Sequence, residues 1–531
     1  MSNFAFLQAE WALVFEAAKQ AEHHTHGDAR SACFYARRAL ELAVNWLYTH
    51  DKALKLPYQD NLSALIHEPS FRQAVGDALF TKARLVKDLG NLAVHSTKKV
   101  ASTDALSATR ELFHFCFWLA RTYGRAGRPD PGLSFKAELL PKPQAPSAAA
   151  LTAEQLKKLG EQLREKDAKL SEVLASHAAL DAELQKLREE VAAAKKANSA
   201  VPDTHDYSEA ETRRAFIDLL LREAGWQLDP VKNFEVEVAG MPNGEGKGFV
   251  DYVLWGDDGK PLMLVEAKRT TKSPMVGQQQ AKLYADCLEK QYGQRPVICF
   301  SNGYEHWLWD DLNYPPRAVQ GFYKKDELML LVQRRSSRKA LANETINGTI
   351  VERYYQTRAV RRVGASFEAD RQRKALLVMA TGSGKTRTVI ALIDLLMRCN
   401  WAKRVLFLAD RVALVNQTVN AFKAHLPDSA PVNLVTDKAT EGRVFVSTYP
   451  TMMGLIDETF DGQRRFGVGH FDLVVIDEAH RSVYQKYGAI FQYFDSLLVG
   501  LTATPKDEVD RNTYGLFELE DGVPTDAYDL D

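Results

Sequence analysis

The stretch ALLVMATGSGKT, residues 375–386, decides the fold of the C-terminal part of the chain. The apolar run ALLVM predicts a buried strand, and TVIALIDLLM (388–397) predicts the helix that follows it. Glycines between a strand and a helix let backbone N–H groups approach phosphate oxygens, where the helix dipole also favours negative charge. The pattern therefore predicts a phosphate-binding loop on an α/β sheet.

Each position of this loop has an expected role. Lys385 reaches the β- and γ-phosphate oxygens of a nucleotide, and Thr386 holds Mg²⁺. Met379 stands where the general pattern of such loops has its first glycine. The residues of the loop expected to bind ATP are Thr381, Gly382, Ser383, Gly384, Lys385 and Thr386.

Two later motifs complete a nucleotide-hydrolysing pattern. LVVIDE (473–478) is an apolar run that ends in two acids, of which Asp477 would hold Mg²⁺ and Glu478 would polarise the attacking water. LTATP (501–505) ends a further apolar run. Because short apolar runs alternate with helical segments from residue 370 onward, we expect a mostly parallel sheet.

A second constellation lies on two neighbouring hydrophobic runs, GFVDYVLW (248–255) and LMLVEAK (262–268). Phosphodiester hydrolysis uses a divalent metal, and Mg²⁺ prefers one or two carboxylates together with phosphate oxygens. Asp251 and Glu266 would be these catalytic metal ligands, and Lys268 would orient water or stabilise charge. The alternative is a buried ion pair between Lys268 and one of the two acids. The pattern is weak when taken alone, but charges inside apolar strands are costly without a use.

The N-terminal region has a different organisation. Residues 1 to about 125 show apolar residues at helical spacing, and a proline-rich break follows between residues 124 and 146. From about 151 to 197, apolar residues recur at heptad spacing in a segment rich in Ala, Glu, Lys and Leu. This segment is either a paired coiled coil or a solvated helical spacer.

Composition excludes several classes of protein. The 531 residues suggest three or four domains, and the net charge of -1 excludes a global polycation that binds nucleic acid in bulk. No apolar run approaches the ~20 residues of a membrane span, and the N-terminus lacks the features of a secretory signal. The five cysteines are scattered without a CxxC pair, which predicts neither disulfides nor structural zinc. We therefore expect a cytoplasmic protein without a membrane partner.

The acidic constellation resembles the PD-(D/E)xK nuclease fold, in the branch with a Gln-x-x-x-Tyr motif on the next helix. The resemblance implies that Gln280 and Tyr284 position DNA or the active-site lysine. The proline of the family motif is absent, because Val250 precedes Asp251. Glu211 is an optional outer carboxylate, although a solvated helix charge is the simpler interpretation.

The phosphate loop with Asp477-Glu478-Ala479-His480 and Leu501–Pro505 resembles superfamily 2 helicases and translocases. The resemblance implies that Gln356 reads adenine, and that Leu408–Arg411 and Ser447-Thr448 contact the DNA backbone. The residues that would couple the state of ATP to DNA are His480, Thr502 and Thr504. Such motors use two RecA-like domains. After LTATP only 26 residues follow, so we expect half of an ATPase.

The order of these motifs across nearly the whole chain resembles the R (HsdR) subunit of type I restriction endonucleases, and Leu89–His95 resembles the DUF4145 domain found in some of them. The implied multidomain architecture is a helical DUF4145-like domain (1–140), a linker and heptad helix (141–203), an α/β PD-(D/E)xK nuclease domain (204–335) and an α/β RecA-like domain (336–531).

This resemblance implies ATP and Mg²⁺ as cofactors. It implies double-stranded DNA and the modification (M) and specificity (S) subunits as partners, in a system that cleaves unmodified foreign DNA after ATP-dependent translocation. We expect the chain to be an N-terminal fragment or truncated product of such a subunit. Two alternatives are a stand-alone defence or repair nuclease-helicase, and a non-catalytic fragment that binds ATP or partners.

Overall fold

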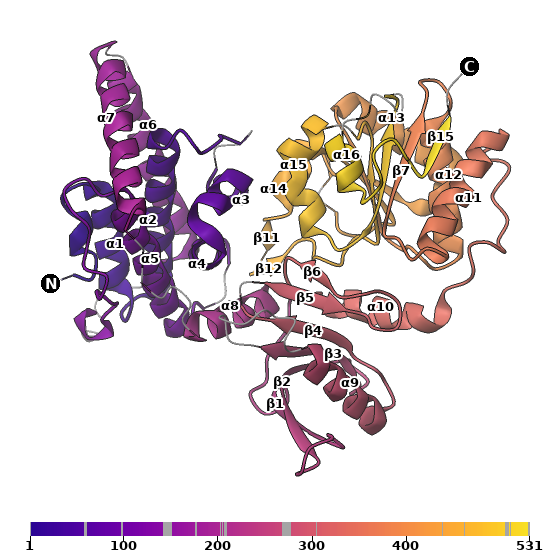
Figure 1. The fold of residues 1–531 in the computed structure, drawn as a ribbon, viewed down its shortest axis with the longest axis horizontal. Coiled ribbons are helices and arrows are strands. Elements are labelled where there is room, and N and C mark those ends of the chain that lie inside the picture. Colours follow the sequence, from indigo (N-terminus) through magenta and orange to yellow (C-terminus); the bar gives the residue numbers. More distant parts are fainter. Residues whose placement is uncertain are drawn as a thin grey trace. The chain divides into compact units, whose positions relative to one another are not determined.

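The computed structural model describes residues 2–57, 61–96, 99–141, 151–175, 178–201, 203, 205, 210–267, 278–303, 305–437, 439–460, 462–479, 481–504, 509 and 511–528. The described residues form two compact units (Figure 1). The first contains the residues up to Glu223 and the short segment Thr459–Gln463, and the second contains the other described residues from Ala224 onward. The architecture is therefore helical at the N-terminus and α/β in the remainder.

The first unit is built from helices. Their bounds are α1 Ala12–His24, α2 Ala29–His50, α3 Leu62–His67, α4 Pro69–His95, α5 Ser102–Tyr123, α6 Ala153–Ala175, α7 Ala178–Ser199 and α8 Ala210–Glu223. Helices α2, α4 and α5 pack on one another around buried aromatic residues such as Phe113 and Phe115. Charges also enter this core, because Lys82 Nζ and Glu111 Oε2 form a fully buried ion pair at 2.6 Å.

The heptad segment contains the helices α6 and α7, and residues 176 and 177 between them lie outside the described residues. Both helices pack on the N-terminal helices of the same unit. Leu156 and Val191 are buried, and Gly160 lies close to the Phe34 ring. Lys195 Nζ donates to Asp51 Oδ2 at 2.6 Å, which attaches α7 to the end of α2. The segment is therefore not simply a solvated spacer, since part of its apolar seam is buried against its own unit.

The second unit contains two sheets. The first has six strands in the order β1-β2-β3-β4-β5-β6, all antiparallel to their neighbours except the parallel pair β3 and β4. Helix α9, Gln278–Tyr292, connects this parallel pair, and α10, Lys325–Ser337, follows the last strand. The strand bounds are β1 Phe234–Ala239, β2 Lys247–Trp255, β3 Pro261–Ala267, β4 Val297–Ser301, β5 His306–Trp309 and β6 Arg317–Val319.

The second sheet has seven parallel strands in the order β15-β7-β14-β13-β8-β10-β9. This confirms the parallel sheet expected from the alternating apolar runs. The bounds are β7 Lys374–Met379, β8 Val405–Ala409, β9 Pro431–Asn433, β10 Val444–Thr448, β13 Leu473–Ile476, β14 Leu497–Thr502 and β15 Asp526–Tyr528. A separate two-stranded ribbon consists of β11 Thr459–Phe460 and β12 Gln463–Arg464.

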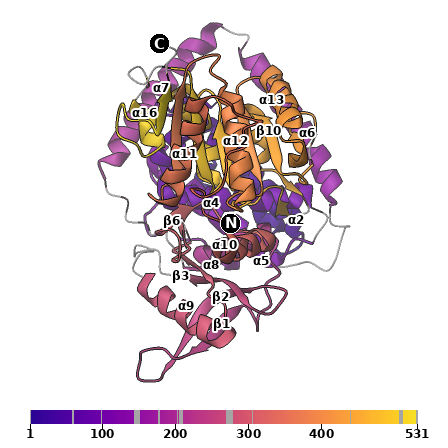
Figure 2. The ribbon, with the colours of Figure 1, turned by 90° about the vertical axis from the view of Figure 1, so that its right-hand side faces the viewer.

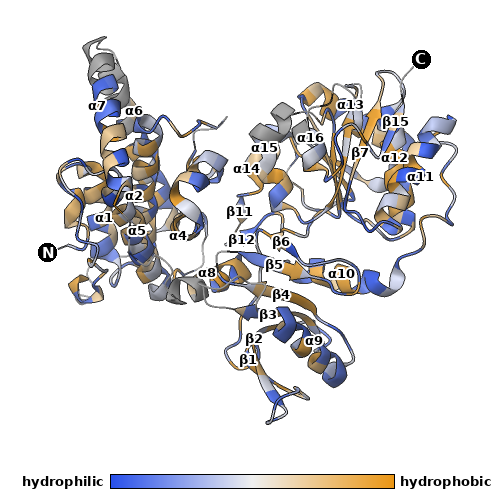
Figure 3. Cartoon of the chain, viewed as in Figure 1, coloured by the Kyte–Doolittle hydropathy of each residue, from blue (hydrophilic) through white to orange (hydrophobic). Residues whose placement is uncertain are grey.

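Helices cover both faces of the parallel sheet. Helices α11 Tyr354–Glu368, α12 Lys385–Arg398 and α13 Val412–His425 lie side by side on one face (Figure 2). Helices α14 Tyr449–Leu455, α15 Arg481–Tyr493 and α16 Arg511–Leu516 lie on the other (Figure 1). The central strands are mostly hydrophobic (Figure 3) and, apart from Lys374 at the start of β7, buried. Burial on both faces explains why these strands are continuous apolar runs in the sequence.

The cysteines and the apolar content of the helices are the last two features of the fold. All five cysteines are free and buried. Of the helices among the described residues, none has the length and apolarity needed to cross a membrane.

Candidate nucleotide-binding and nuclease sites

The phosphate loop connects β7 to α12, as the sequence predicts. Gly382 and Gly384 adopt φ values of 80° and 89°, which favour glycine, and Gly384 is the N-cap of α12. Ser383 is fully buried, whereas Lys385 and Thr386 are half-buried on the first turn of the helix. The loop thus presents the N-terminus of a helix, the usual place for phosphate in such folds.

Gln356 holds the phosphate loop from the side of α11. Its Nε2 donates to the Ser383 carbonyl at 3.0 Å, and the Tyr355 hydroxyl donates to the same carbonyl at 3.0 Å. A Cβ on Gly384 would lie 2.4 Å from Gln356 Nε2, so an alanine there would displace the Gln356 amide from its hydrogen bond with the Ser383 carbonyl. The predicted adenine-reading residue therefore lies directly against the loop.

Tyr355 and Tyr528 are contributors that the sequence analysis missed. Their rings stack at a centroid distance of 3.6 Å with an interplanar angle of 8°. The Tyr528 carbonyl also accepts a hydrogen bond from Ala380 N at 3.0 Å, at the start of the loop. The position of Tyr355 beside Gln356 was a possible signal, but nothing local in the sequence links either residue to Tyr528.

The two acids after β13 lie at the phosphate loop. Glu478 Oε1 and Lys385 Nζ form an ion pair at 3.3 Å, which joins motifs that are 93 residues apart in the sequence. Burial, together with the charge of Glu478, raises the pKa of Asp477. Glu478 itself adopts a left-handed φ of 54°, and such strain is often found at functional sites. The arrangement can place two carboxylates beside a bound phosphate and its cation.

The remaining predicted motor residues differ in their burial and in their hydrogen bonds. Thr502, at the end of β14, is buried, and its Oγ1 accepts a hydrogen bond from Thr504 N at 3.1 Å. Thr448 caps α14 through the Thr451 backbone N–H, and Ser447 is buried beside it. Asp410 and Arg411 are exposed. His480 lies outside the described residues.

The two predicted nuclease carboxylates, Asp251 and Glu266, lie on the neighbouring strands β2 and β3. Tyr252 pairs with Val265 in the antiparallel ladder, so Asp251 and Glu266 occupy the next facing positions on one face of the sheet. Asp251 Oδ2 accepts a hydrogen bond from Ala267 N at 2.6 Å, and Glu266 is 4% exposed. Two carboxylates on neighbouring strands suit a hard divalent cation. Within the described ranges, no group of three or more His, Cys, Asp or Glu side chains is placed to hold a metal.

The supporting nuclease residues lie together on α9. Gln280 Nε2 donates to the Tyr284 hydroxyl at 2.7 Å, and the Tyr284 ring packs against β2 where Gly248 leaves space for it. Lys268, the third member of the predicted catalytic set, lies outside the described residues. The side chain of Glu211 also lies outside the part of α8 whose side chains are described.

Three regions of the chain match known families. Residues 349–507 match the family described as "Type III restriction enzyme, res subunit", and residues 208–319 match "Type I restriction enzyme R protein N terminus". Residues 19–173 match DUF4145, a domain of unknown function. The two restriction-enzyme matches include the phosphate loop and the Asp251–Glu266 pair.

Two similar proteins from Escherichia coli are endonuclease subunits of type I restriction enzymes. The chain is 27% identical over 395 residues to the type I restriction enzyme EcoKI endonuclease subunit of Escherichia coli (strain K12), covering 58% of this chain and 33% of that protein. It is 30% identical over 311 residues to the EcoAI endonuclease subunit of Escherichia coli, covering 53% and 35%. The chain thus spans about a third of the length of these relatives.

A solved fragment of an HsdR subunit from Vibrio vulnificus YJ016 is 25% identical, with 59% of this chain and 58% of that chain covered. Its TM-score is 0.24, which is too low to bear on a shared fold. The similarity to restriction enzymes therefore rests on the family matches and on the two Escherichia coli proteins. The chain is thus similar to the R subunits of type I restriction enzymes over residues 208–319, and to the res subunit of type III restriction enzymes over residues 349–507.

Proposed function

We propose that the chain supplies the DNA-cleaving and ATP-dependent motor part of a type I restriction R subunit. In this proposal residues 204–335 form a PD-(D/E)xK-like nuclease domain and 336–531 form a first RecA-like domain. Residues 1–140 form a DUF4145-like domain, and 141–203 a linker and heptad helix. Double-stranded DNA is the substrate, and the M and S subunits are the partners that recognise and modify the target sequence. The Lys385–Glu478 ion pair is the observation that carries the proposal, because it brings the phosphate loop and the acidic motif into one site.

In the motor site, the N-terminus of α12 and Lys385 would bind the nucleotide phosphates. Asp477 and Thr386 supply oxygen ligands of the kind that Mg²⁺ prefers, and a cation would offset the charge that burial makes costly at Asp477. Glu478 would polarise the attacking water. Thr502 and Thr504 would transmit the state of this site to DNA.

In the nuclease site, Asp251 and Glu266 would hold Mg²⁺. When bound, this ion would polarise the phosphoryl group and activate a water molecule. The hydrogen bond from Ala267 N orients the Asp251 carboxylate toward the end of β3. Lys268 would stabilise the developing charge. The contact between Gln280 and Tyr284 would support the substrate side of this face.

Mg²⁺-dependent cleavage of double-stranded DNA by the purified chain tests the nuclease assignment. We expect Glu266→Gln to lower cleavage by about 100-fold or more, since a lost metal ligand removes several kcal/mol of transition-state stabilisation. Glu237→Gln is the matched control, because Glu237 is an exposed carboxylate on the neighbouring strand β1. Equal loss in both variants, or cleavage by Glu266→Gln at the wild-type rate, would refute the assignment.

Association with M and S subunits separates the restriction proposal from a stand-alone nuclease-helicase. A full-length protein containing this chain should co-purify with both subunits and carry out ATP-dependent cleavage of unmodified DNA only with them. ATP-dependent cleavage of unmodified DNA by the full-length protein without those partners would support the stand-alone alternative instead.

A further inference from the structure

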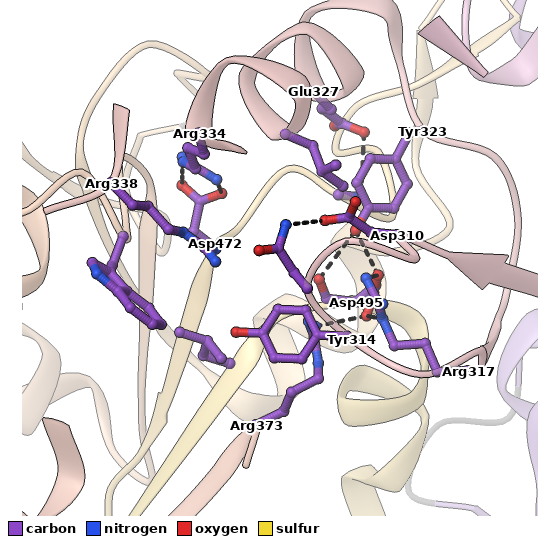
Figure 4. A pocket seen from close by; sticks show the side chains of 15 residues that line it. Asp310, Tyr314, Arg317, Tyr323, Glu327, Arg334, Arg338, Arg373, Asp472 and Asp495 are labelled. Carbon is purple, nitrogen blue, oxygen red and sulfur yellow. Dashed lines mark hydrogen bonds and ion pairs between the residues drawn. The ribbon is translucent and has the colours of Figure 1, made fainter. Parts of the chain in front are cut away.

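A polar pocket lies at the amino-terminal edge of the parallel sheet, within the second unit (Figure 4). The space between its lining residues, counted together with the part that is open to solvent, is about 580 Å³. Residues from the β5–β6 connection and α10 line it on one side. Residues next to the starts of β7, β13 and β14 line it on the other. It is distinct from the phosphate loop, which lies at the carboxyl ends of the same strands.

Four arginines line this pocket: Arg317, Arg334, Arg338 and Arg373. The lining also contains four acids, Asp310, Asp472, Asp495 and Glu327. Figure 4 shows these side chains approaching the pocket from several directions. Whether the pocket can accept an anion depends on how the acids are already compensated.

Each aspartate has its own cationic partner. Asp495 accepts from Arg317 Nε and Nη2 and from Arg373 Nη2, each at 2.7 Å. Asp472 accepts from Arg334 Nη2 at 2.7 Å and from two backbone N–H groups. Asp310 accepts from Arg335 Nε at 2.9 Å, a fifth guanidinium behind the lining. Five guanidinium groups thus stand against three aspartates and Glu327.

Glu327 is only partly ionised near neutral pH. Its side chain is fully buried, and burial raises the pKa of this carboxyl to about 7. One oxygen, Oε2, accepts hydrogen bonds from the backbone N–H groups of Lys324 and Gly469, at 2.9 and 3.2 Å. The local balance is therefore an excess of positive charge even with Glu327 ionised.

Arg338 carries the excess. Among the described residues no carboxylate forms an ion pair with it, and its guanidinium lies over the Trp401 ring at 4.5 Å. Burial lowers the pKa of Arg338, and a hydrogen bond with the Tyr314 side chain and the charge of Asp310 oppose this effect. Within the same described part of the chain, Arg338 Nε, Arg334 Nε and Arg317 Nη1 are buried N–H donors without a hydrogen-bond acceptor. Buried donors of charged groups are costly when no acceptor reaches them.

We propose that this pocket binds a phosphate-class oxyanion, held by Arg338 with further donors from Arg317, Arg334 and Arg373. Such an ion offers several acceptor oxygens and a charge that offsets the Arg338 guanidinium, which has no carboxylate ion pair among the described residues, a match that arginine geometry favours. The shared chemistry is the phosphate group, whether free or at the end of a nucleotide or nucleic acid strand. The site is independent of the proposed restriction function.

Calorimetric titration of the full chain with inorganic phosphate, at constant ionic strength, tests the site. The background variant is Lys385→Ala, which weakens binding at the phosphate loop. In this background we expect saturable binding that Arg338→Gln weakens at least tenfold, and that Arg338→Lys weakens less. Lys423→Gln, an exposed cation on α13, is the control and should leave the affinity unchanged.

The outcomes are distinct. Binding that disappears in Lys385→Ala alone belongs to the phosphate loop and overturns the proposal, as does binding that Arg338→Gln leaves unchanged. If Arg338→Gln does not fold, Arg338→Lys decides, because affinity equal to that of the background would also overturn it. Adenosine monophosphate and a 5′-phosphorylated oligonucleotide, titrated in the same background, identify the source. Tighter binding than free phosphate identifies the carrier, and equal or weaker binding identifies the free ion.

Discussion

Arg317 of β6 and Asp495, two residues before β14, form a two-point ion pair across 178 residues of sequence, with Nε–Oδ1 and Nη2–Oδ2 distances of 2.7 Å. The Tyr323 hydroxyl also donates to Asp495 Oδ2, at 2.6 Å. Burial alone would raise the pKa of Asp495, but Arg317 and Arg373 hold it well below its usual range. The pair joins the six-stranded sheet to the start of a strand that ends at Thr502.

Removing one partner of this pair should destabilise the second unit strongly. Arg317→Ala leaves a buried carboxylate with less compensation, a change that costs about 3–5 kcal/mol in comparable buried pairs. We therefore expect a clear fall in the apparent melting temperature. Glu518→Gln is the control, because its ion pair with Lys374 is largely exposed and should contribute less than about 1 kcal/mol. Similar melting temperatures for the two variants would show that the buried pair is energetically neutral.

The two glycines of the phosphate loop should differ in their tolerance of alanine. Both have positive φ, so each substitution introduces backbone strain of about 1–2 kcal/mol. Only at Gly384 does the new Cβ also meet Gln356 Nε2, at 2.4 Å, whereas nothing lies within 4 Å at Gly382. Gly384→Ala should therefore lower the melting temperature more than Gly382→Ala. Adding Gln356→Ala should remove the difference, and a difference that persists would contradict the steric explanation.

The Lys385–Glu478 pair predicts opposite effects of its two members on nucleotide binding. Lys385→Ala removes a cation from the phosphates and should weaken ATP binding about tenfold or more, since hydrogen bonds to charged groups contribute about 1.5–3 kcal/mol. Glu478→Gln releases Lys385 from its partner at 3.3 Å and should leave ATP binding as tight as in the wild type or tighter. Fluorescence anisotropy with a labelled ATP analogue measures both affinities, and Lys403→Gln serves as an exposed control. A lower affinity of Glu478→Gln for the ATP analogue than that of the wild type would mean that the Glu478 carboxylate contributes to nucleotide binding, and not only to polarising the attacking water.

The strands that carry these sites could be predicted because they are buried on both faces. ALLVM and LVVI are unbroken apolar runs, and each forms the expected strand, β7 and β13. β15 could not be predicted in this way, since the triplet Asp526–Tyr528 has no apolar pattern of its own. It forms a strand because the edge of β7 supplies its hydrogen-bond partners.

The local motifs indicated the phosphate loop and the facing acids, but not the residues that position them. Gln356 and the phosphate loop each belong to a motif that can be recognised in the sequence. The contact between Tyr355 and Tyr528, in contrast, joins two residues that lie far apart in the sequence. The arginine pocket is a stronger example. Three of its ion pairs, Arg317–Asp495, Arg334–Asp472 and Arg373–Asp495, join residues more than 100 positions apart, and single arginines and aspartates are common on surfaces. Such pairings depend on tertiary contacts that sequence periodicity does not contain.

Glu327 should make the stability of the second unit depend on pH near neutrality. Its side chain is fully buried, and burial raises its pKa to about 7 in the folded protein, against a model-peptide value of about 4.3. The folded state therefore binds more protons than the unfolded state between these values. The stabilisation is complete below about pH 4 and is lost as the pH rises through about 7, by up to about 4 kcal/mol.

Glu327→Gln removes this titration while keeping an oxygen that can accept from the Lys324 and Gly469 backbone N–H groups. We expect the wild-type melting temperature to fall between pH 5 and pH 8 by several degrees more than that of Glu327→Gln. Charges facing this carboxyl come from Lys324, Asp326 and Arg404, while His470 is kept neutral by burial, which lowers its pKa. Glu520→Gln, which alters an exposed carboxylate, should follow the wild-type curve. Parallel curves for wild type and Glu327→Gln would place the titrating group elsewhere.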